Sequence, residues 1–168
     1  KYFKKNQKSK KNIYYNSFDW LISSKIIGGP ESLYFSKNQI KLWIDEHFPV
    51  GSFFWNNELC AKRLINLIYA YDFYAISSSE NDKKKFQYII YKHYVVNKIY
   101  IKSLSANKLS IENTKASLLL GLLYEEKVTN YIEIIKKQLI EHIDINGFHK
   151  SYNPVVQAEY INNLIEIK

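Results

Sequence analysis

The sequence has no methionine, one cysteine, three prolines and a single arginine in 168 residues. The lone Cys60 excludes an internal disulfide, and no Cys/His spacing typical of a zinc site is present. No apolar run approaches the ~18–20 residues that a membrane helix needs. We therefore expect no metal, no cofactor and no membrane partner. Because natural chains normally begin with methionine, a chain that begins at Lys1 is expected to be a fragment of a longer protein.

The formal net charge of +8 raises the question of a nucleic-acid partner. All 24 basic residues except Arg63 are lysine, and Asn, Ile and Tyr are frequent too. These residues have AT-rich codons, so the composition of a genome explains the charge without a partner. Proteins that bind phosphates favour the planar guanidinium of arginine. We therefore expect no nucleic-acid partner, whereas an acidic carbohydrate is compatible with the charge.

Polar breaks divide the chain into segments with apolar residues at helical spacing. Residues 1–12 are mostly Lys, Asn, Gln and Ser, which predicts a basic linker or arm. Helices are predicted over 18–27, 37–48, 57–76, 82–103, 111–124, 127–143 and 154–167. The signals that define their ends are Gly28-Gly29-Pro30, a capping box of Ser36 and Gln39, an N-cap at Asn56 or Asn57, the pair Pro49 and Gly51, and Asn153-Pro154.

The predicted helices are of two kinds. Those over 57–76 and 111–124 are apolar nearly all round, which predicts burial, whereas those over 82–103 and 127–143 are amphipathic. Ala116, Ser117 and Gly121 are small enough to let helices approach closely. The alternation predicts an all-α fold, and a ring of helical hairpins in two layers would show it. Any α-solenoid would show it too, although the chain lacks the fixed period of TPR or HEAT arrays.

The single arginine lies in the middle of a predicted buried helix. Asn66 shares the face of Arg63, Tyr69 lies at the edge of that face, and Trp55 directly precedes the helix. A polar face on a buried helix must point at a partner or at a wet cleft. In one interpretation Arg63 pairs with an acidic residue of another helix. In the other it borders a cleft, with aromatic rings for sugar stacking and the guanidinium for a carboxylate or sulfate.

The acidic residues available for such a pair include Asp72 and Glu112. Asn113 stands at the start of the helix over 111–124, where simple helix-start chemistry is the alternative to a role in a site. His149 and Tyr152 lie in the loop DINGFHKSYNP, residues 144–154, and loops on rigid scaffolds often carry function. No Ser/His/Asp order, phosphate loop or metal motif is present.

Three segments of the sequence, taken in their order along the chain, can be compared with a known protein family. They are W-N-N-x-L-x-x-x-R-L-I-N at 55–66, E-N-x-K-A at 112–116, and N-G-x-H followed by S-x-N-P at 146–154. In this order the chain resembles, over most of residues 17–167, the N-terminal helical domain of heparinase II/III-like proteins, particularly the proteobacterial branch. The resemblance implies an incomplete (α/α) toroid of about seven helices in antiparallel hairpins over 13–168. It also implies a β-sandwich domain downstream and a periplasmic or secreted location.

The resemblance further implies a polysaccharide lyase that cleaves an acidic, uronate-containing glycan, such as heparan sulfate or alginate, by β-elimination. Asn113 falls near the family position that neutralises the uronate carboxylate. Tyr152 or His149 would assist proton transfer, because the usual tyrosine position holds Val155 or Val156 here. The residues expected to border the glycan cleft are Trp55, Arg63, Asn66 and Tyr69. The alternatives are a non-catalytic glycan-binding or assembly module on the same scaffold, and a helical protein-interaction scaffold.

Overall fold

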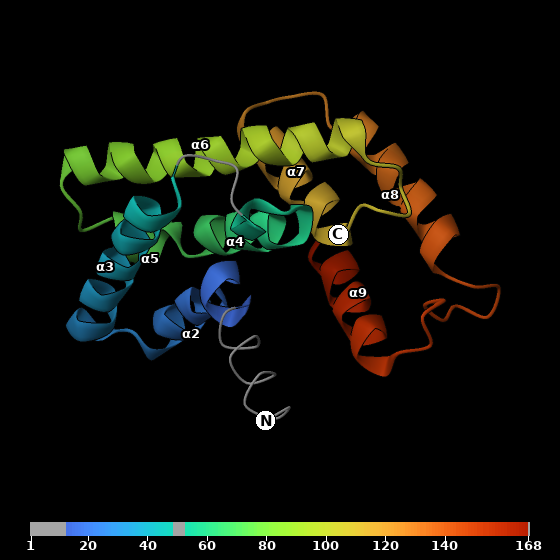
Figure 1. Cartoon of the computed structure of the whole chain (residues 1–168), viewed down its shortest axis with the longest axis horizontal. Coiled ribbons are helices and arrows are strands. Elements are labelled where there is room, and N and C mark those ends of the chain that lie inside the picture. Colours follow the sequence, from blue (N-terminus) through green and yellow to red (C-terminus); the bar gives the residue numbers. More distant parts are fainter. Residues whose placement is uncertain (1–12, 49–52, 168) are drawn as a thin grey trace. The chain divides into compact units, whose positions relative to one another are not determined.

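The computed structural model describes residues 13–48 and 53–167 (Figure 1). Within these ranges every regular element is a helix, with one isolated β-bridge between Ile143 and His149, so the all-α prediction is confirmed. The predicted arm over 1–12 and the predicted helix-ending pair Pro49 and Gly51 lie outside the described residues. The chain divides into two compact units, one up to His93 and the other from Tyr94.

The first unit contains a short helical stretch over 13–17 and five further elements. These are α2 (Asp19–Ile27), α3 (Gly29–His47), the 3-10 turn η1 (Phe53–Trp55), α4 (Asn57–Tyr69) and α5 (Tyr71–Ala75), followed by the first part of α6 (Glu80–Ser103). Helix α2 packs against α3 and α4, and α5 packs against α3 and α4 (Figure 1). Along the sequence, the boundary between the two units falls within α6.

Helix α3 begins much earlier than residue 37. Pro30 fits its first turn, where the missing N–H is not needed, and Gly28 carries the chain into it with a φ of 68°. Ser36 is consequently a residue of the helix interior, with a buried Oγ that has no hydrogen-bond partner. The predicted capping box of Ser36 and Gln39 is therefore wrong. The predicted N-cap of α4 is confirmed, because Asn56 Oδ1 accepts the Leu59 N–H at 3.0 Å.

An aromatic cluster centred on Trp43 forms the core of the first unit. The Trp43 ring lies 5.5 Å from that of Phe18 and 5.7 Å from that of Trp55, and all three side chains are buried. Burying rings of this size contributes much of the hydrophobic stabilisation of a small unit. The Trp43 indole N–H donates to Asn16 Oδ1 at 2.8 Å, so the polar group of this ring is satisfied too.

The helix predicted over 57–76 is two helices. Helix α4 ends at Tyr69, Ala70 has a non-helical backbone, and α5 follows at once. Helix ends leave carbonyl groups without intrahelical donors. At this break the Tyr74 hydroxyl folds back and donates to the Leu67 carbonyl at 3.0 Å. A buried tyrosine thus satisfies one of the groups that the interruption releases.

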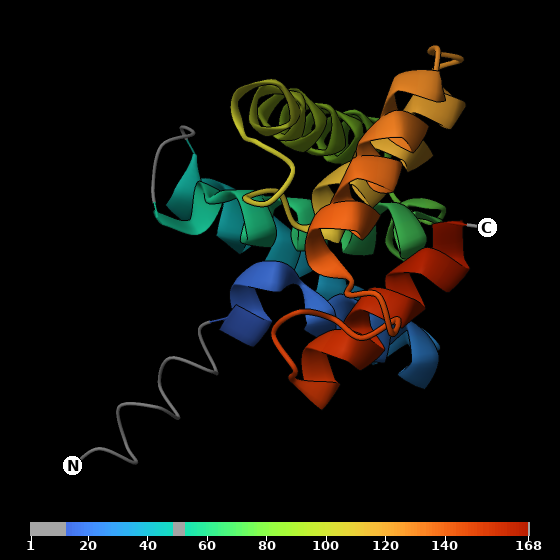
Figure 2. The ribbon, with the colours of Figure 1, turned by 90° about the vertical axis from the view of Figure 1, so that its right-hand side faces the viewer.

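The second unit consists of the later part of α6 with α7 (Ile111–Leu123), α8 (Thr129–His142) and α9 (Pro154–Ile167). Helix α7 packs against both α8 and α9 (Figure 2). The buried core of this unit contains Ile111, Leu118, Tyr131, Ile135 and Tyr160. The predicted close approach at Gly121 is confirmed, because a Cβ added there would lie 3.1 Å from both Tyr131 and Val128.

A hydrogen-bonded network of buried amides and hydroxyls joins the helices of the second unit. The Asn113 amide donates to Asn97 Oδ1 at 2.7 Å, and the Asn97 amide donates to the Asn113 carbonyl and to Ser117 Oγ, each at 2.8 Å. Thr114 Oγ1 donates to Gln138 Oε1 at 2.7 Å. Because buried polar groups cost free energy when they lack partners, this network fixes how α6, α7 and α8 meet.

Candidate functional site

The Arg63 side chain is completely buried. Its Nε donates to His93 Nε2 at 2.7 Å, Nη1 to the Asn16 carbonyl at 2.6 Å and Nη2 to the Phe54 carbonyl at 2.9 Å. The guanidinium carbon lies 4.1 Å from the centre of the Trp43 ring, in cation–π range. The prediction that Arg63 borders a wet cleft is therefore wrong, because protein groups enclose the guanidinium.

Among the residues that the structure describes, Arg63 has no acidic partner. Its acceptors there are two backbone carbonyls and an imidazole nitrogen, so neither Asp72 nor Glu112 forms the ion pair that the sequence suggested. Asp72 instead pairs with Lys25 at 2.6 Å. Burial lowers the pKa of Arg63 to about 10, which still leaves the side chain charged at neutral pH. Aromatic faces and fixed dipoles replace the solvation of this cation.

The other residues predicted to border that cleft also make contacts with protein groups around Arg63 and α4. Trp55 is only 2% exposed and its ring stacks on His93 at 4.5 Å, so it offers no open face to a sugar. The Asn66 amide donates to the Ser17 carbonyl and to Asp19 Oδ1, each at 3.0 Å. Tyr69 is half-buried, and its carbonyl accepts from Lys25 at 2.7 Å.

The polar face predicted for this helix therefore exists, and it holds the segment around residues 16–19. Arg63 bonds the carbonyl of Asn16, and Asn66 bonds the carbonyl of the next residue, Ser17. The sequence could show that the two side chains share a face, but it could not show that the preceding chain covers it.

Asn113 is also completely buried, and its contacts are those of a helix start. Its Oδ1 accepts the Ser110 N–H at 3.1 Å while its own backbone N–H faces the Ser110 side chain, and the two together form a capping box at the beginning of α7; the Ser110 hydroxyl also donates to Asn113 Oδ1 at 3.0 Å. Its amide donates to Asn97. The helix-start interpretation is confirmed, and a carboxylate-binding position for this side chain would need it to be accessible, which it is not.

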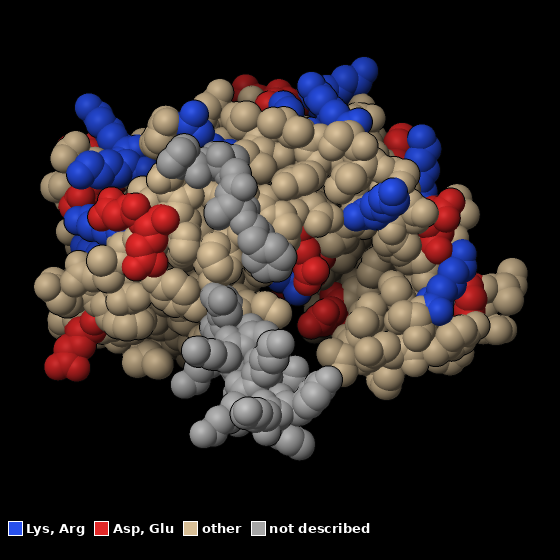
Figure 3. Space-filling model, viewed as in Figure 1, with Lys and Arg blue, Asp and Glu red and all other residues tan. Residues whose placement is uncertain are grey.

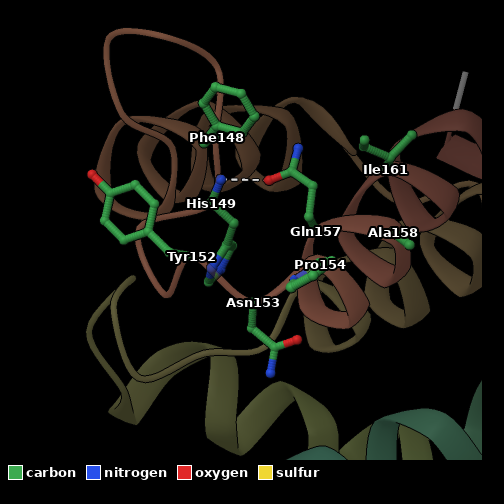
Figure 4. Close-up of a pocket in the computed structure, with 8 residues that line it drawn as sticks. All are labelled: Phe148, His149, Tyr152, Asn153, Pro154, Gln157, Ala158 and Ile161. Carbon is green, nitrogen blue, oxygen red and sulfur yellow. Dashed lines mark hydrogen bonds between the residues drawn. The ribbon is translucent and has the colours of Figure 1, made fainter.

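His149 and Tyr152, in contrast, line one surface pocket of about 390 Å³ in the second unit (Figure 4). The loop between α8 and α9 forms one wall, and the first turns of α9 form the other. The complete lining is Phe148, His149, Tyr152, Asn153, Pro154, Gln157, Ala158 and Ile161. Of the sequence-predicted catalytic residues, these two are the ones that the structure brings together at an accessible site.

Asp144 organises the loop that supplies this wall. Its Oδ1 accepts the N–H groups of Asn146 and Phe148, each at 2.9 Å, and its Oδ2 accepts the Tyr152 hydroxyl at 3.2 Å. These donors, led by the Phe148 N–H, lower the pKa of the Asp144 carboxyl. The carboxylate thus links the beginning of the loop to the phenol at its end.

Gln157 anchors the same loop to α9. Its Oε1 accepts the backbone N–H of His149, the bond drawn in Figure 4, and its amide donates to the Gly147 carbonyl at 3.4 Å. Two unusual backbone conformations allow the loop to turn: Gly147 has a φ of 84° and Tyr152 has a φ of 51°. Asn153 then caps α9 by accepting the Val155 N–H at 2.9 Å, as Asn153-Pro154 predicted.

The hydrogen bonds of His149 fix its neutral tautomer. The Ser151 N–H points at Nδ1 at 3.2 Å, so this nitrogen accepts and carries no proton. The Ser151 hydroxyl lies 2.8 Å from the same nitrogen and donates to it. The proton of the neutral ring therefore sits on Nε2. His149 can offer an N–H donor to an anionic ligand, whereas its Nδ1 is occupied by Ser151.

Sequence reasoning missed Phe148, Gln157 and Ile161 as members of this pocket. Pro154, Ala158 and Ile161 recur at i, i+4 and i+7, a spacing that indicates one apolar face of α9. The sequence could not show that this face is open. Phe148 is 57% exposed and Ile161 is 44% exposed, so apolar side chains border the pocket instead of the core.

Two features are absent from the described residues, a metal-binding group and a membrane-spanning helix. Within them, no three His, Cys, Asp or Glu side chains are grouped so as to hold a metal ion. No helix in the described ranges is both long and apolar enough to cross a membrane. On the face drawn in Figure 3, lysines and acidic residues are interspersed and do not form a single basic stripe. Comparison with protein-family models, curated proteins and solved structures yields no match.

Proposed function

We propose that this chain is the helical part of a heparinase-like polysaccharide lyase acting on a uronate-containing glycan. In this proposal the chain binds the glycan in the pocket between the loop over 144–153 and α9. The supporting observation is that His149 and Tyr152 line the same accessible pocket beside the amides of Asn153 and Gln157. A β-elimination requires a hydrogen-bond donor for the uronate carboxylate and a group that transfers protons. The imidazole and the amides can supply the donor, and the phenol can transfer a proton.

Each side chain has a role that follows from its hydrogen bonds. His149 presents Nε2–H, which suits the uronate carboxylate and favours negative charge at C5 while the C5–H bond breaks. The electron pair forms the C4–C5 double bond as the C4–O4 bond cleaves. The Tyr152 hydroxyl leaves its acceptor Asp144 Oδ2 and gives its proton to the departing O4, and Phe148 supplies an apolar face for a sugar ring. The base that takes the C5 proton comes from the downstream domain that the resemblance implies.

The proposal moves the glycan site away from the residues first expected to form it. Arg63, Trp55 and Asn113 become supports of the helical core, since each is buried among protein groups. A toroidal arrangement of the helices belongs to the same proposal, as do the acidic polysaccharide and the periplasmic or secreted location. No nucleic acid, membrane, metal or cofactor takes part in the proposed reaction.

The test is a lyase assay on heparan sulfate, alginate and other uronate polymers. It uses the longest natural protein that contains the 168-residue chain, because the proposed base lies in the downstream domain, and it follows the ultraviolet absorbance of the unsaturated product. We expect a rise with at least one polymer, and a rise reduced at least tenfold by Tyr152→Phe. Tyr34→Phe is the matched control, because Tyr34 is 70% exposed in the other unit. Absence of product with every polymer excludes the lyase.

Binding measured with the same polymers separates the non-catalytic alternative. A glycan that binds the pocket without any product identifies a glycan-binding or assembly module. Its binding should weaken on Phe148→Ala and should not change on Tyr34→Phe. This outcome would agree with the absence of a tyrosine at Val155 and Val156.

A helical protein-interaction scaffold is the second candidate function. Two observations favour it: the Arg63 face is covered by protein, and apolar side chains of Phe148, Pro154, Ala158 and Ile161 make up half of the pocket lining. Exposed apolar residues of this kind often mark protein-binding surfaces. A chain that neither binds nor cleaves any acidic glycan, but that loses a protein partner on Ile161→Asp, would establish this function.

A further inference from the structure

Behind the pocket, the end of α8, the loop and α9 meet in a cluster of three rings. The His142 ring lies 5.7 Å from that of His149 and 5.7 Å from that of Tyr160, and the His149 and Tyr160 rings lie 5.4 Å apart. His142 Nδ1 and the Tyr160 hydroxyl are buried and have no hydrogen-bond partner. His149 is also a lining residue of the pocket, so the ring cluster and the pocket share a wall.

The backbone closes the loop directly over this cluster. Ile143 and His149 form an antiparallel bridge, the Lys150 N–H donates to the His142 carbonyl at 2.8 Å, and the Asp144 N–H donates to the Phe148 carbonyl at 2.8 Å. These bonds place Phe148 and Tyr152 at the rim. If the bridge opens, the wall of the pocket that belongs to the loop is lost.

The surroundings of His142 disfavour a positive charge on its ring. His149 and Lys150 face it from the loop, Glu141 is its neighbour on α8, and the backbone of Asn107 contributes a hydrogen bond from the α6–α7 connection. Tyr160 on α9 is neutral and faces Glu112 of α7. Glu141 is exposed, so its attraction is screened by water, whereas the two rings are in contact.

We propose that the ring cluster is an acid-sensitive clasp: protonation of His142 beside His149 breaks the Ile143–His149 bridge and opens the pocket. As a regulator of glycan binding the clasp rests on the proposed function. The opening of the loop at low pH does not depend on the proposed function, because it is a property of the loop alone. A glycan held at neutral pH would be released on acidification.

Whether acid opens or closes the loop follows from the direction of the pKa shift of His142. Burial, then the neighbouring His149 ring, lower the pKa of His142 below its ordinary value in the closed loop, against the hydrogen bond of Asn107 and the charge of Glu141. In an open loop the ring returns to about 6.5. The closed state therefore has its full stability above about pH 6.5 and loses it as the pH falls below that value.

Hydrogen exchange read by NMR on the 168-residue chain, without ligand, tests the clasp. The reporters are the amides of Asp144 and Lys150, with exchange rates divided by their intrinsic values at each pH. Between about pH 7.5 and about pH 5, we expect their protection to fall by more than about twofold, because one proton binds more strongly to the open loop than to the closed loop. The Leu118 amide of α7 should keep its protection, which distinguishes loop opening from unfolding.

Two variants remove the titrating ring in different ways. His142→Gln keeps a side-chain donor and His142→Phe keeps a ring, and in both the fall in protection should be less than about twofold. His47→Gln is the control, because His47 in α3 also has a pKa lowered by burial. A fall of equal size in wild type and His142→Gln would overturn the clasp, and so would unchanged protection in wild type. Failure of glycan binding would overturn the proposed function alone.

Discussion

Arg63 Nε donates to His93 Nε2 at 2.7 Å, and neither side chain is exposed to solvent. On its other side the His93 ring donates from Nδ1 to the Ile89 carbonyl at 2.8 Å, so its tautomer is fixed. The only guanidinium of the chain and a neutral imidazole thus connect α4 to α6. Lysine could not replace the arginine, because three acceptors in different directions need a planar fork with several N–H groups.

The first prediction concerns this arginine. Arg63→Lys should lower the free energy of unfolding by about 3–5 kcal/mol, because the Asn16 and Phe54 carbonyls lose their donor and a buried charge loses its fork. Urea denaturation followed by circular dichroism measures the change. Lys62→Met is the control, since Lys62 is partly exposed and its removal should change stability by less than about 1 kcal/mol. Equal stability of Arg63→Lys and wild type would contradict the role of the fork.

The second prediction concerns pH. Burial, then the charge of Arg63, hold the pKa of His93 well below 6.5, so the folded chain keeps the ring neutral. A histidine with a lowered pKa contributes stability that is complete above about pH 6.5 and declines as the pH falls below that value. Urea midpoints should therefore decrease from pH 7 towards about pH 5. His93→Gln, whose amide can still accept from Arg63, should show a smaller decrease.

The pH result has a specific alternative. His47 and His142 also have lowered pKa values and act in the same direction, so part of the acid sensitivity will survive in His93→Gln. If His93→Gln instead retained the complete acid dependence of wild type, His93 would not be the buried neutral ring described above.

The third prediction separates structure from catalysis at Asn113. Asn113→Ala removes the capping box of α7 and the partner of Asn97, so the free energy of unfolding should fall by about 3 kcal/mol. Asn162→Ala, at an exposed position of α9, should change it by less than about 0.5 kcal/mol. A normally stable Asn113→Ala that lost glycan binding would instead support the carboxylate-binding role inferred from the resemblance.

The fourth prediction concerns Tyr152, which is 75% exposed. Tyr152→Phe deletes the hydroxyl that donates to Asp144 Oδ2, and at such exposure the stability should change by less than about 0.5 kcal/mol. Product formation should fall at least tenfold with little change in KM, because the missing proton acts in the transition state. A rise in KM at unchanged kcat would assign the hydroxyl to binding.

Local signals were enough to predict that the chain is helical and where most of its helices lie. Asn56 and Asn153 cap helices where their side chains can reach the next backbone N–H groups, and both were readable from sequence. The capping box predicted at Ser36 was wrong because the same spacing also occurs within helices. Helix α3 begins earlier, with Pro30 in its first turn. The interruption at Ala70 gave no signal in the sequence, because the residues on both sides of it continue the apolar helical pattern.

The candidate site was less predictable than the helices. That Arg63 and Asn66 share a face follows from helical spacing, but which segment covers the face depends on the chain around residues 16–19. His149 and Tyr152 could be chosen because they stand on a loop. Gln157, which holds that loop to α9, gave no signal, because a glutamine in a helix is ordinarily a solvated residue.

The hydrogen bonds between Asn97 and Asn113 have a consequence for how this sequence can diverge. The Asn113 amide donates to Asn97 Oδ1, and the Asn97 amide donates to the backbone carbonyl of Asn113; because both residues are buried, an apolar replacement at either position leaves a polar group of the other without its partner. Related chains should therefore change the two positions jointly, either keeping both amides or exchanging both for hydrocarbon. A collection of relatives in which the two vary independently would show that α6 and α7 tolerate sliding past one another.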